Sequence, residues 1–104
     1  MTEGTFNHRL VELTAVSGAR LGDPPGLAAV VIAAASAVGL STYGPPSIHS
    51  GPKGVAVALV GHGGHVILHA LPEQARCLVD IVALTPANAE RGVEVIARRL
   101  SANG

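Results

Sequence analysis

The chain has 104 residues, and 48% of them are hydrophobic, although Phe6 and Tyr43 are its only aromatic side chains. Seven basic and seven acidic residues give a formal net charge of zero, which argues against a basic stripe for nucleic acid. Cys77 is the single cysteine, so an intramolecular disulfide framework is excluded. This length predicts one domain, residues 1–104, with a core of Val, Leu, Ile and Ala.

Neither the start of the chain nor its apolar segments carry a targeting or membrane signal. Residues 1–7 lack the basic-then-apolar order of a signal peptide. The longest apolar run, Leu27–Val38, is shorter than the ~20 residues that a membrane-spanning helix needs. We therefore expect a cytoplasmic protein that binds no membrane. Because small aliphatic side chains bury little area each, we also expect the chain to gain stability as a homodimer.

The first part of the chain predicts a strand followed by a helix. Partial alternation over residues 6–16 favours a strand, and Gly18–Gly22 is expected to be a connector. Asp23-Pro24-Pro25 is a helix-start signal, because Asp accepts orphan backbone N–H groups where proline needs no donor. We expect the helix to run to Val38, with Gly39 as a left-handed cap. Its small residues indicate a helix that lies flat against a sheet.

The middle of the chain alternates short apolar segments with glycine-rich connections. Leu40–Tyr43 is predicted as a short strand, and Gly44–Gly54 as a loop because Pro and Gly punctuate it. Val55–Val60 is predicted as a buried strand, Gly61–Gly64 as a tight connection and His65–Ala70 as a strand. In that last strand, His65, Ile67 and His69 share one face.

The last part of the chain predicts one more strand and a helix. A turn at Leu71–Gln74 leads into a strand at Ala75–Leu84. Thr85-Pro86 is expected to cap a helix that ends near Leu100. The predicted order is therefore β-α-β-β-β-β-α. Consecutive strands with helices on one face are typical of an α+β two-layer sandwich.

The stretch Gly61–Glu73 contains a histidine pattern with the spacing of a known motif. It resembles the Glu-Ser-His-x-x-Ile-His-x-x-Pro-Glu segment of bacterial S-adenosylmethionine decarboxylases, whose serine cleaves its own chain to form a pyruvoyl cofactor. His65 and His69 match the two histidines without a gap, and the Pro-Glu also matches. Gly64 stands in place of the serine and Gly63 in place of the acid.

Three shorter segments extend this resemblance along the chain. His8-Arg9-Leu10-Val11-Glu12 is similar to the first strand of the family, Ser41-Thr42-Tyr43 to its Ser-Thr-Phe, and Val79-Asp80-Ile81 to its Val-Asp-Val. The resemblance implies the S-adenosylmethionine decarboxylase-like sandwich over about the whole chain. It also implies that Glu12, Tyr43 and His65 lie at ligand-binding positions.

The resemblance implies four catalytic groups, and this chain keeps one of them. His69 matches the histidine that assists self-cleavage, whereas Ala56 falls near the assisting serine and Leu84 at the proton-donating cysteine. Gly64 replaces the serine that becomes the pyruvoyl group, so no cofactor is expected. Lys53, the only lysine, lies in a Gly-Pro-Lys-Gly turn without a motif for pyridoxal phosphate.

Three functions remain open at this point. The first is an inactive homologue in polyamine biosynthesis that binds an adenosyl or amine ligand, or modulates an active paralogue. The second is a working decarboxylase of the polyamine pathway. The third is a metal-binding module that uses His49, His62 and His65. Cys77 has two interpretations: a thiol with a pKa lowered by Arg76, or a small residue that fills the core.

Overall fold

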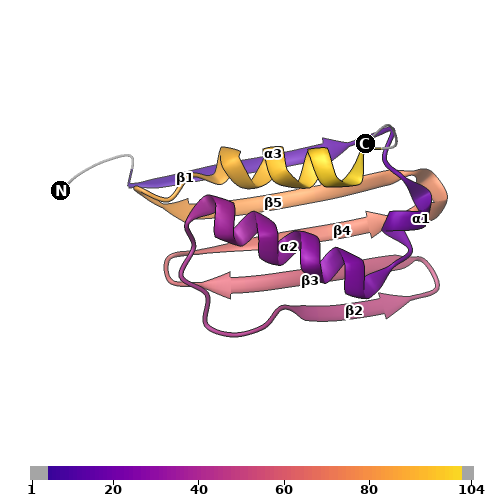
Figure 1. Cartoon of the computed structure of the whole chain (residues 1–104), viewed down its shortest axis with the longest axis horizontal. Helices are drawn as coiled ribbons and strands as arrows, with labels where there is room; N and C mark the ends of the chain where they lie inside the picture. The colour runs from indigo at the N-terminus through magenta and orange to yellow at the C-terminus, as the bar shows by residue number, and fades with distance from the viewer. Residues whose placement is uncertain (1–4, 102–104) are drawn as a thin grey trace.

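The computed structural model describes residues 5–101, which form one antiparallel sheet covered by helices on one face (Figure 1). The sheet has five strands in the order β1-β5-β4-β3-β2. Their bounds are Phe6–Leu13 (β1), Ser47–Gly51 (β2), Gly54–Gly61 (β3), Gly64–Leu71 (β4) and Arg76–Leu84 (β5). The helices are α1 (Gly18–Leu21), α2 (Pro24–Val38), the 3-10 turn η1 (Pro72–Gln74) and α3 (Ala89–Leu100). The predicted α+β two-layer sandwich is confirmed.

Helix α2 begins and ends where the sequence predicts. The Asp23 carboxylate accepts a hydrogen bond from the backbone N–H of Gly26 at 3.3 Å, and Gly39 closes the helix with a φ of 86°. Such a left-handed cap suits glycine because glycine has no Cβ. Leu27 and Val31 are completely buried on the side of α2 that faces the sheet. The small residues of α2 therefore let it lie close to the strands.

The core lies between the helices and one face of the sheet. The side chains that point to the helices from β3, β4 and β5 are buried, with 0% exposure for Val57, Leu68, Val79 and Ile81. Cys77 is also fully buried on this face, and its burial raises the pKa of its thiol to about 12. The core-filling interpretation of Cys77 is therefore confirmed, and the lowered-pKa interpretation is wrong because desolvation disfavours the thiolate.

The second strand is not where the sequence predicts it. Residues Leu40–Tyr43 make a single isolated bridge, between Thr42 and Gly61, and no strand. Strand β2, Ser47–Gly51, instead lies inside the predicted loop Gly44–Gly54. All of its residues are exposed, so it carries no alternation of buried and polar positions. As an edge strand it tolerates flanking prolines, which made the segment resemble a loop.

Other boundaries shift by a few residues. Strand β1 ends at Leu13 rather than 16, and the predicted connector Gly18–Gly22 contains the single helical turn α1. Helix α3 is capped by Asn88, whose side chain accepts a hydrogen bond from the N–H of Glu90 at 3.0 Å, and not by Thr85-Pro86. Each shift reflects a capping or turn contact rather than a change of layer.

The helices of residues 5–101 are short, and the longest, α2, has 15 residues. Among these residues, no helix is both long and apolar enough to cross a membrane.

Candidate functional site

Polar side chains gather on the face of the sheet that no helix covers, hereafter the open face. In β4, Val66 and Leu68 are buried under the helices, while His65, Ile67 and His69 alternate with them. The predicted shared face of these three residues is therefore confirmed. Strand β5 follows the same alternation, and β1 follows it with half-buried residues in place of buried ones, except at the exposed Arg9. The open face is the part of the molecule where titratable groups meet on rigid strands.

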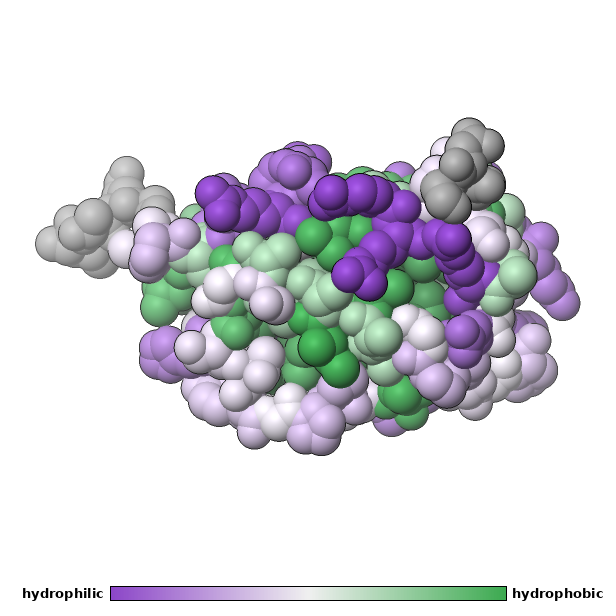
Figure 2. Space-filling model, viewed as in Figure 1, coloured by the Kyte–Doolittle hydropathy of each residue, from purple (hydrophilic) through white to green (hydrophobic). Residues whose placement is uncertain are grey.

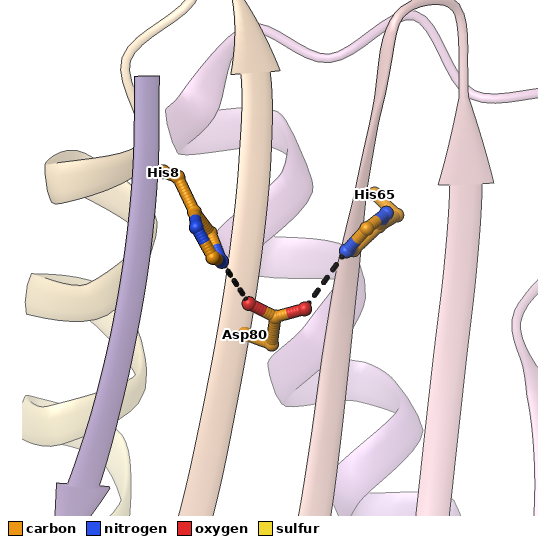
Figure 3. A network of polar contacts seen from close by, with 3 residues as sticks. All are labelled: His8, His65 and Asp80. Atoms are coloured by element: carbon orange, nitrogen blue, oxygen red, sulfur yellow. Dashed lines mark hydrogen bonds and ion pairs between the residues drawn. The ribbon is translucent and has the colours of Figure 1, made fainter. Parts of the chain in front are cut away.

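Three of these groups form a polar cluster across β1, β5 and β4 (Figure 3). Asp80 lies between two histidines: His8 Nε2 contacts its Oδ1, and His65 Nε2 lies 3.1 Å from its Oδ2. His8 and His65 both lie opposite Val82, two positions from Asp80. The contacts are therefore diagonal ones across neighbouring strands, which long side chains can bridge.

The cluster keeps Asp80 in its charged form. Partial burial by itself raises the pKa of this carboxyl, but hydrogen bonds from His8 and His65 and their charge outweigh the burial and lower it. The side chain of Asp80 remains 32% exposed. The open face therefore presents a carboxylate at neutral pH, already held by two ring nitrogens.

A shallow groove of about 330 Å³ runs beside this cluster. Leu10, Ile67 and Leu78 supply apolar surface to it, while His8, Asp80 and His69 supply polar groups. An apolar surface with a few convergent polar groups is typical of a small-molecule site. This groove is the best-supported ligand site on the open face.

His69, the residue that matches the assisting histidine, lies on β4 with one strand on either side. Its cross-strand partners are Ala56 on β3 and Leu78 on β5. Ala56 is the position near which the assisting serine of the family falls. The structure therefore brings these two matched positions opposite each other, but Ala56 offers no hydroxyl.

Gly64 is the first residue of β4, directly opposite Gly61. A Cβ atom built on Gly64 overlaps the carbonyl oxygen of Val82, and it lies 3.0 Å from the carbonyl carbon of Val82 and 3.2 Å from Cα of Ala83. These are backbone atoms of β5, which cannot rotate away as a side chain can. Position 64 therefore lacks both a side chain and the room for one.

The matched catalytic positions lie at two separate places on the sheet. A Cβ on Gly63 would come within 2.9 Å of Cβ of Leu84, so Leu84, the predicted match to the family cysteine, lies beside the β3–β4 turn. His69 lies five residues from Gly64 along a strand that pairs without a bulge, which corresponds to ~17 Å. His69 is therefore distant from position 64.

The three expected ligand-binding residues are not brought together. The Tyr43 hydroxyl lies 3.5 Å from Nδ1 of His62, beside the β3–β4 turn. Glu12 lies near the other end of the sheet, 3.7 Å from Arg76, and His65 contacts Asp80. His65 alone belongs to the polar cluster.

His8 and Asp80 complete that cluster, and they were noted in the sequence as family matches rather than as contacts. Each lies at an alternating position of its own strand, on the side away from the helices. Only the register of β1 and β4 against β5 shows that they meet.

The histidines proposed as metal ligands are also dispersed. His49 lies opposite Ala56 on the edge strand β2, whereas His62 lies in the β3–β4 turn. Within residues 5–101, no group of three His, Cys, Asp or Glu side chains is arranged to hold a metal ion. The metal-binding alternative has no support in this part of the chain.

Comparisons with known proteins agree with this architecture. The crystal structure of the adenosylmethionine decarboxylase from Aquifex aeolicus VF5 matches with a TM-score of 0.80 and 18% identity, covering 89% of this chain and 78% of that one. At this identity, the likeness shows the fold. The comparison with curated proteins found no match. The family model described as S-adenosylmethionine decarboxylase matches residues 7–104, nearly the whole chain, and the chain therefore belongs to the S-adenosylmethionine decarboxylase family.

Proposed function

We propose that this protein is a member of the family that does not process itself. It serves polyamine biosynthesis as a ligand-binding or partner-modulating homologue. One observation carries the proposal: position 64 holds a glycine, and a Cβ there would overlap the backbone of Val82.

Whether the chain can cleave itself depends on the side chain at position 64. A side-chain hydroxyl has to attack the preceding carbonyl carbon and form an ester, and glycine has no such group. The residues here do not fit a pyruvoyl group, because no serine or other hydroxyl stands at position 64. Without that ketone, a substrate amine has no Schiff-base partner and the carbanion left by decarboxylation has no electron sink.

Intact-mass spectrometry of the purified protein tests this proposal. We expect one species near 10.4 kDa and no conversion to two fragments on prolonged incubation. Two fragments divided between Gly63 and His65, together with release of carbon dioxide from S-adenosylmethionine, would instead establish the working decarboxylase.

The variant Gly64→Ser separates the missing hydroxyl from the missing space. We expect it to remain uncleaved and to lose about 1–3 kcal/mol of unfolding free energy, because backbone atoms occupy the new side chain's volume. Gly51→Ser is the matched control, since a Cβ on Gly51 meets nothing within 4 Å. Cleavage of Gly64→Ser at wild-type stability would show that only the hydroxyl is missing.

The groove on the open face is the proposed ligand site. Asp80 offers a negative charge to an amine or sulfonium cation, and Leu10, Ile67 and Leu78 offer apolar surface to the rest of the ligand. Its volume of about 330 Å³ lies at the small end of the range for small-molecule sites. The chemistry favours a compact cationic ligand of the adenosyl or polyamine class.

Calorimetry with S-adenosylmethionine, its decarboxylated product and common polyamines tests this site. We expect His69→Ala and Asp80→Asn to weaken binding about tenfold, which corresponds to ~1.4 kcal/mol. His62→Ala is the control, because His62 lies in the β3–β4 turn and outside the groove. No heat at millimolar ligand, or equal weakening by the control, would remove this site and leave the partner-modulating role.

We further propose that the open face forms a homodimer, or a complex with an active paralogue. Leu10 is 70% exposed and Val60 55% exposed on this face. Burying such side chains against a second chain contributes about 25 cal/mol per Å² of apolar surface. Because the core of this short chain consists of small aliphatic residues, burial of apolar surface at an interface adds stability that the core alone supplies only in part.

Sedimentation of the wild type and two variants tests the dimer. We expect Leu10→Asp to give a monomer of 10.4 kDa, because a charge on the open face would be buried in the interface. Ile32→Asp is the matched control: Ile32 is 50% exposed on α2, away from the sheet, and its variant should stay dimeric. A wild-type monomer at micromolar concentration would contradict the homodimer.

A further inference from the structure

We propose a second binding site, on the helix-covered side of the molecule, for a small phosphorylated metabolite. The site is a cavity of about 440 Å³ bounded by α1, the first half of α2 and the end of α3. It is separated from the groove by the sheet and the core. It goes beyond the proposed function, because it depends neither on position 64 nor on the open face.

Positive charge is concentrated at this cavity. Three of the seven basic residues of the chain line it, Arg20, Arg98 and Arg99, against one of the seven acidic residues, Asp23. Figure 2 shows hydrophilic residues gathered along α3 and toward its C-terminal end, beside an apolar surface over α2. In a chain without net charge, such an excess at one concave place favours an anion.

The single carboxylate that lines the cavity, that of Asp23, caps the start of α2. The Asp23 carboxylate accepts the N–H of Gly26 at 3.3 Å, and the Asp23 carbonyl accepts the N–H of Leu27 at 2.9 Å. Pro24 and Pro25, the first two residues of α2, have no N–H to offer. The start of α2 therefore supplies no donor to a ligand, and its partial positive charge faces Asp23. Recognition of an anion has to come from the arginines.

The two arginines of α3 are the recognition groups. Among residues 5–101, Arg9 forms an ion pair with Glu90 and Arg76 forms one with Glu12, whereas Arg98 and Arg99 form no ion pair. A guanidinium group presents several N–H donors in a planar fork that matches the oxygens of a phosphate. Two adjacent forks at a concave surface suit a phosphate monoester or diphosphate better than a single carboxylate.

The walls of the cavity are held in place before a ligand arrives. The Arg20 guanidinium donates to the backbone carbonyl of Arg99, and Ser17 N–H donates to the carbonyl of Leu100 at 3.0 Å. Val16 and Ser101 form an isolated bridge in the same region. These contacts tie the segment before α1 to the end of α3, which reduces the conformational entropy lost on binding.

The rest of the lining is apolar and fits the organic part of such a ligand. Val30 and Leu100 are 9% and 1% exposed and form the buried side of the cavity. Gly26 adds no side chain there. A volume of about 440 Å³ lies within the range of small-molecule sites. The geometry therefore points to a phosphate at the arginines and an apolar body against Val30 and Leu100.

Calorimetry at low ionic strength with phenyl phosphate and inorganic phosphate as probes tests the site. We expect phenyl phosphate to bind with a Kd of about 1 mM or tighter, and more tightly than inorganic phosphate because its ring reaches the apolar side. The double variant Arg98→Gln/Arg99→Gln should weaken phenyl phosphate at least tenfold. Binding should also weaken as salt is raised.

Arg91→Gln is the matched control, because Arg91 lies on the same helix and outside the cavity lining. We expect it to change the Kd less than twofold, and all variants should keep wild-type thermal unfolding. His69→Ala should also bind phenyl phosphate normally, which keeps this test separate from the groove. Equal weakening by Arg91→Gln, or no saturable binding by a folded wild type, would overturn the proposal.

Discussion

The two faces of the sheet are built from the same strands but carry different kinds of side chain. Beneath the helices, β3, β4 and β5 present Val, Leu, Ile, Ala and Cys side chains that are almost completely buried. On the open face, the same strands present histidines, Asp80 and exposed aliphatic residues. Adjacent residues such as Ile67 and Leu68 therefore experience different surroundings.

The covered face supplies the apolar packing that stabilises the fold, and the open face carries the titratable groups. The helix-covered face holds no buried polar or charged side chain within residues 5–101. The open face can carry a carboxylate between two histidines because water still reaches the group, with Asp80 32% exposed. The chain shares the fold of the matched adenosylmethionine decarboxylase and has a glycine at position 64.

Cysteine reactivity gives the largest expected contrast between the two faces. Burial raises the pKa of Cys77 to about 12, against 9.0 for an ordinary thiol, so the thiolate population at pH 8 falls about 1000-fold. We expect Cys77 to react with a disulfide reagent only after unfolding. Moving the thiol one residue, with Leu78→Cys in a Cys77→Ala background that also carries the monomer-forming Leu10→Asp, should give rapid reaction in the folded state. Equal rates for the two thiols would contradict the contrast.

Truncation of adjacent residues on β4 compares packing on the two faces. Leu68→Ala should lower the unfolding free energy by about 3–4 kcal/mol, because Leu68 is 0% exposed and its removal leaves a cavity. Ile67→Ala removes a half-buried side chain and should lower the stability of the monomer by about 1 kcal/mol. Chemical denaturation measures both values. Similar losses for the two variants, both made in the monomeric Leu10→Asp background, would contradict the difference in packing between the two faces.

An added methyl group tests how closely the helices pack over the covered face. A Cβ on Gly92 of α3 would lie 2.6 Å from Cγ2 of Val38 and 2.7 Å from Cδ1 of Ile81. Gly92→Ala should therefore destabilise by about 1–3 kcal/mol, despite the better helix propensity of alanine. Gly44→Ala, where a Cβ meets nothing within 4 Å, should stay within about 0.5 kcal/mol of the wild type. A stabilised Gly92→Ala would show that α3 can move outward.

The polar cluster of the open face should give the smallest change, and one that depends on pH. The folded-state pKa of Asp80 is lowered, so its stabilising contribution is present above the unfolded pKa of about 3.9 and is lost as pH falls through the folded pKa. Asp80→Asn should lower stability by about 0.5–1 kcal/mol at pH 7 and by less at pH 3. Thermal unfolding from pH 3 to pH 7 measures this difference. A stability difference between Asp80→Asn and the wild type that grows from pH 7 to pH 3 would contradict the lowered pKa of Asp80.

Local patterns were enough for most of the secondary structure. Asp23, the prolines after it and Gly39 carry the capping chemistry of α2 in their own side chains and backbone freedom. Strands β3, β4 and β5 were predicted within a residue or two because their apolar residues repeat at strand spacing. Strand β2 was missed because pairing with β3, rather than any burial pattern, makes it a strand.

The candidate sites depend much more on the tertiary structure. His65 and His69 were predicted to share a face, because that follows from the period of a strand. The contact of Asp80 with His8 and His65 was not predictable, since it depends on the registers of β1 and β4 against β5. The arginine cavity likewise joins residues 20 and 98, which only the packing of α1 against the end of α3 brings together.

The sequence by itself determined the layer order, the faces of the central strands and the absence of a nucleophile at Gly64. These properties follow from single residues and from short repeats of apolar residues along the chain. The tertiary structure decided which groups meet and how much space each has. It shows a carboxylate held between histidines from two other strands, and backbone atoms of Val82 in the volume that a side chain at position 64 would need. Register and packing are properties of the whole chain, because each depends on contacts between residues far apart in sequence.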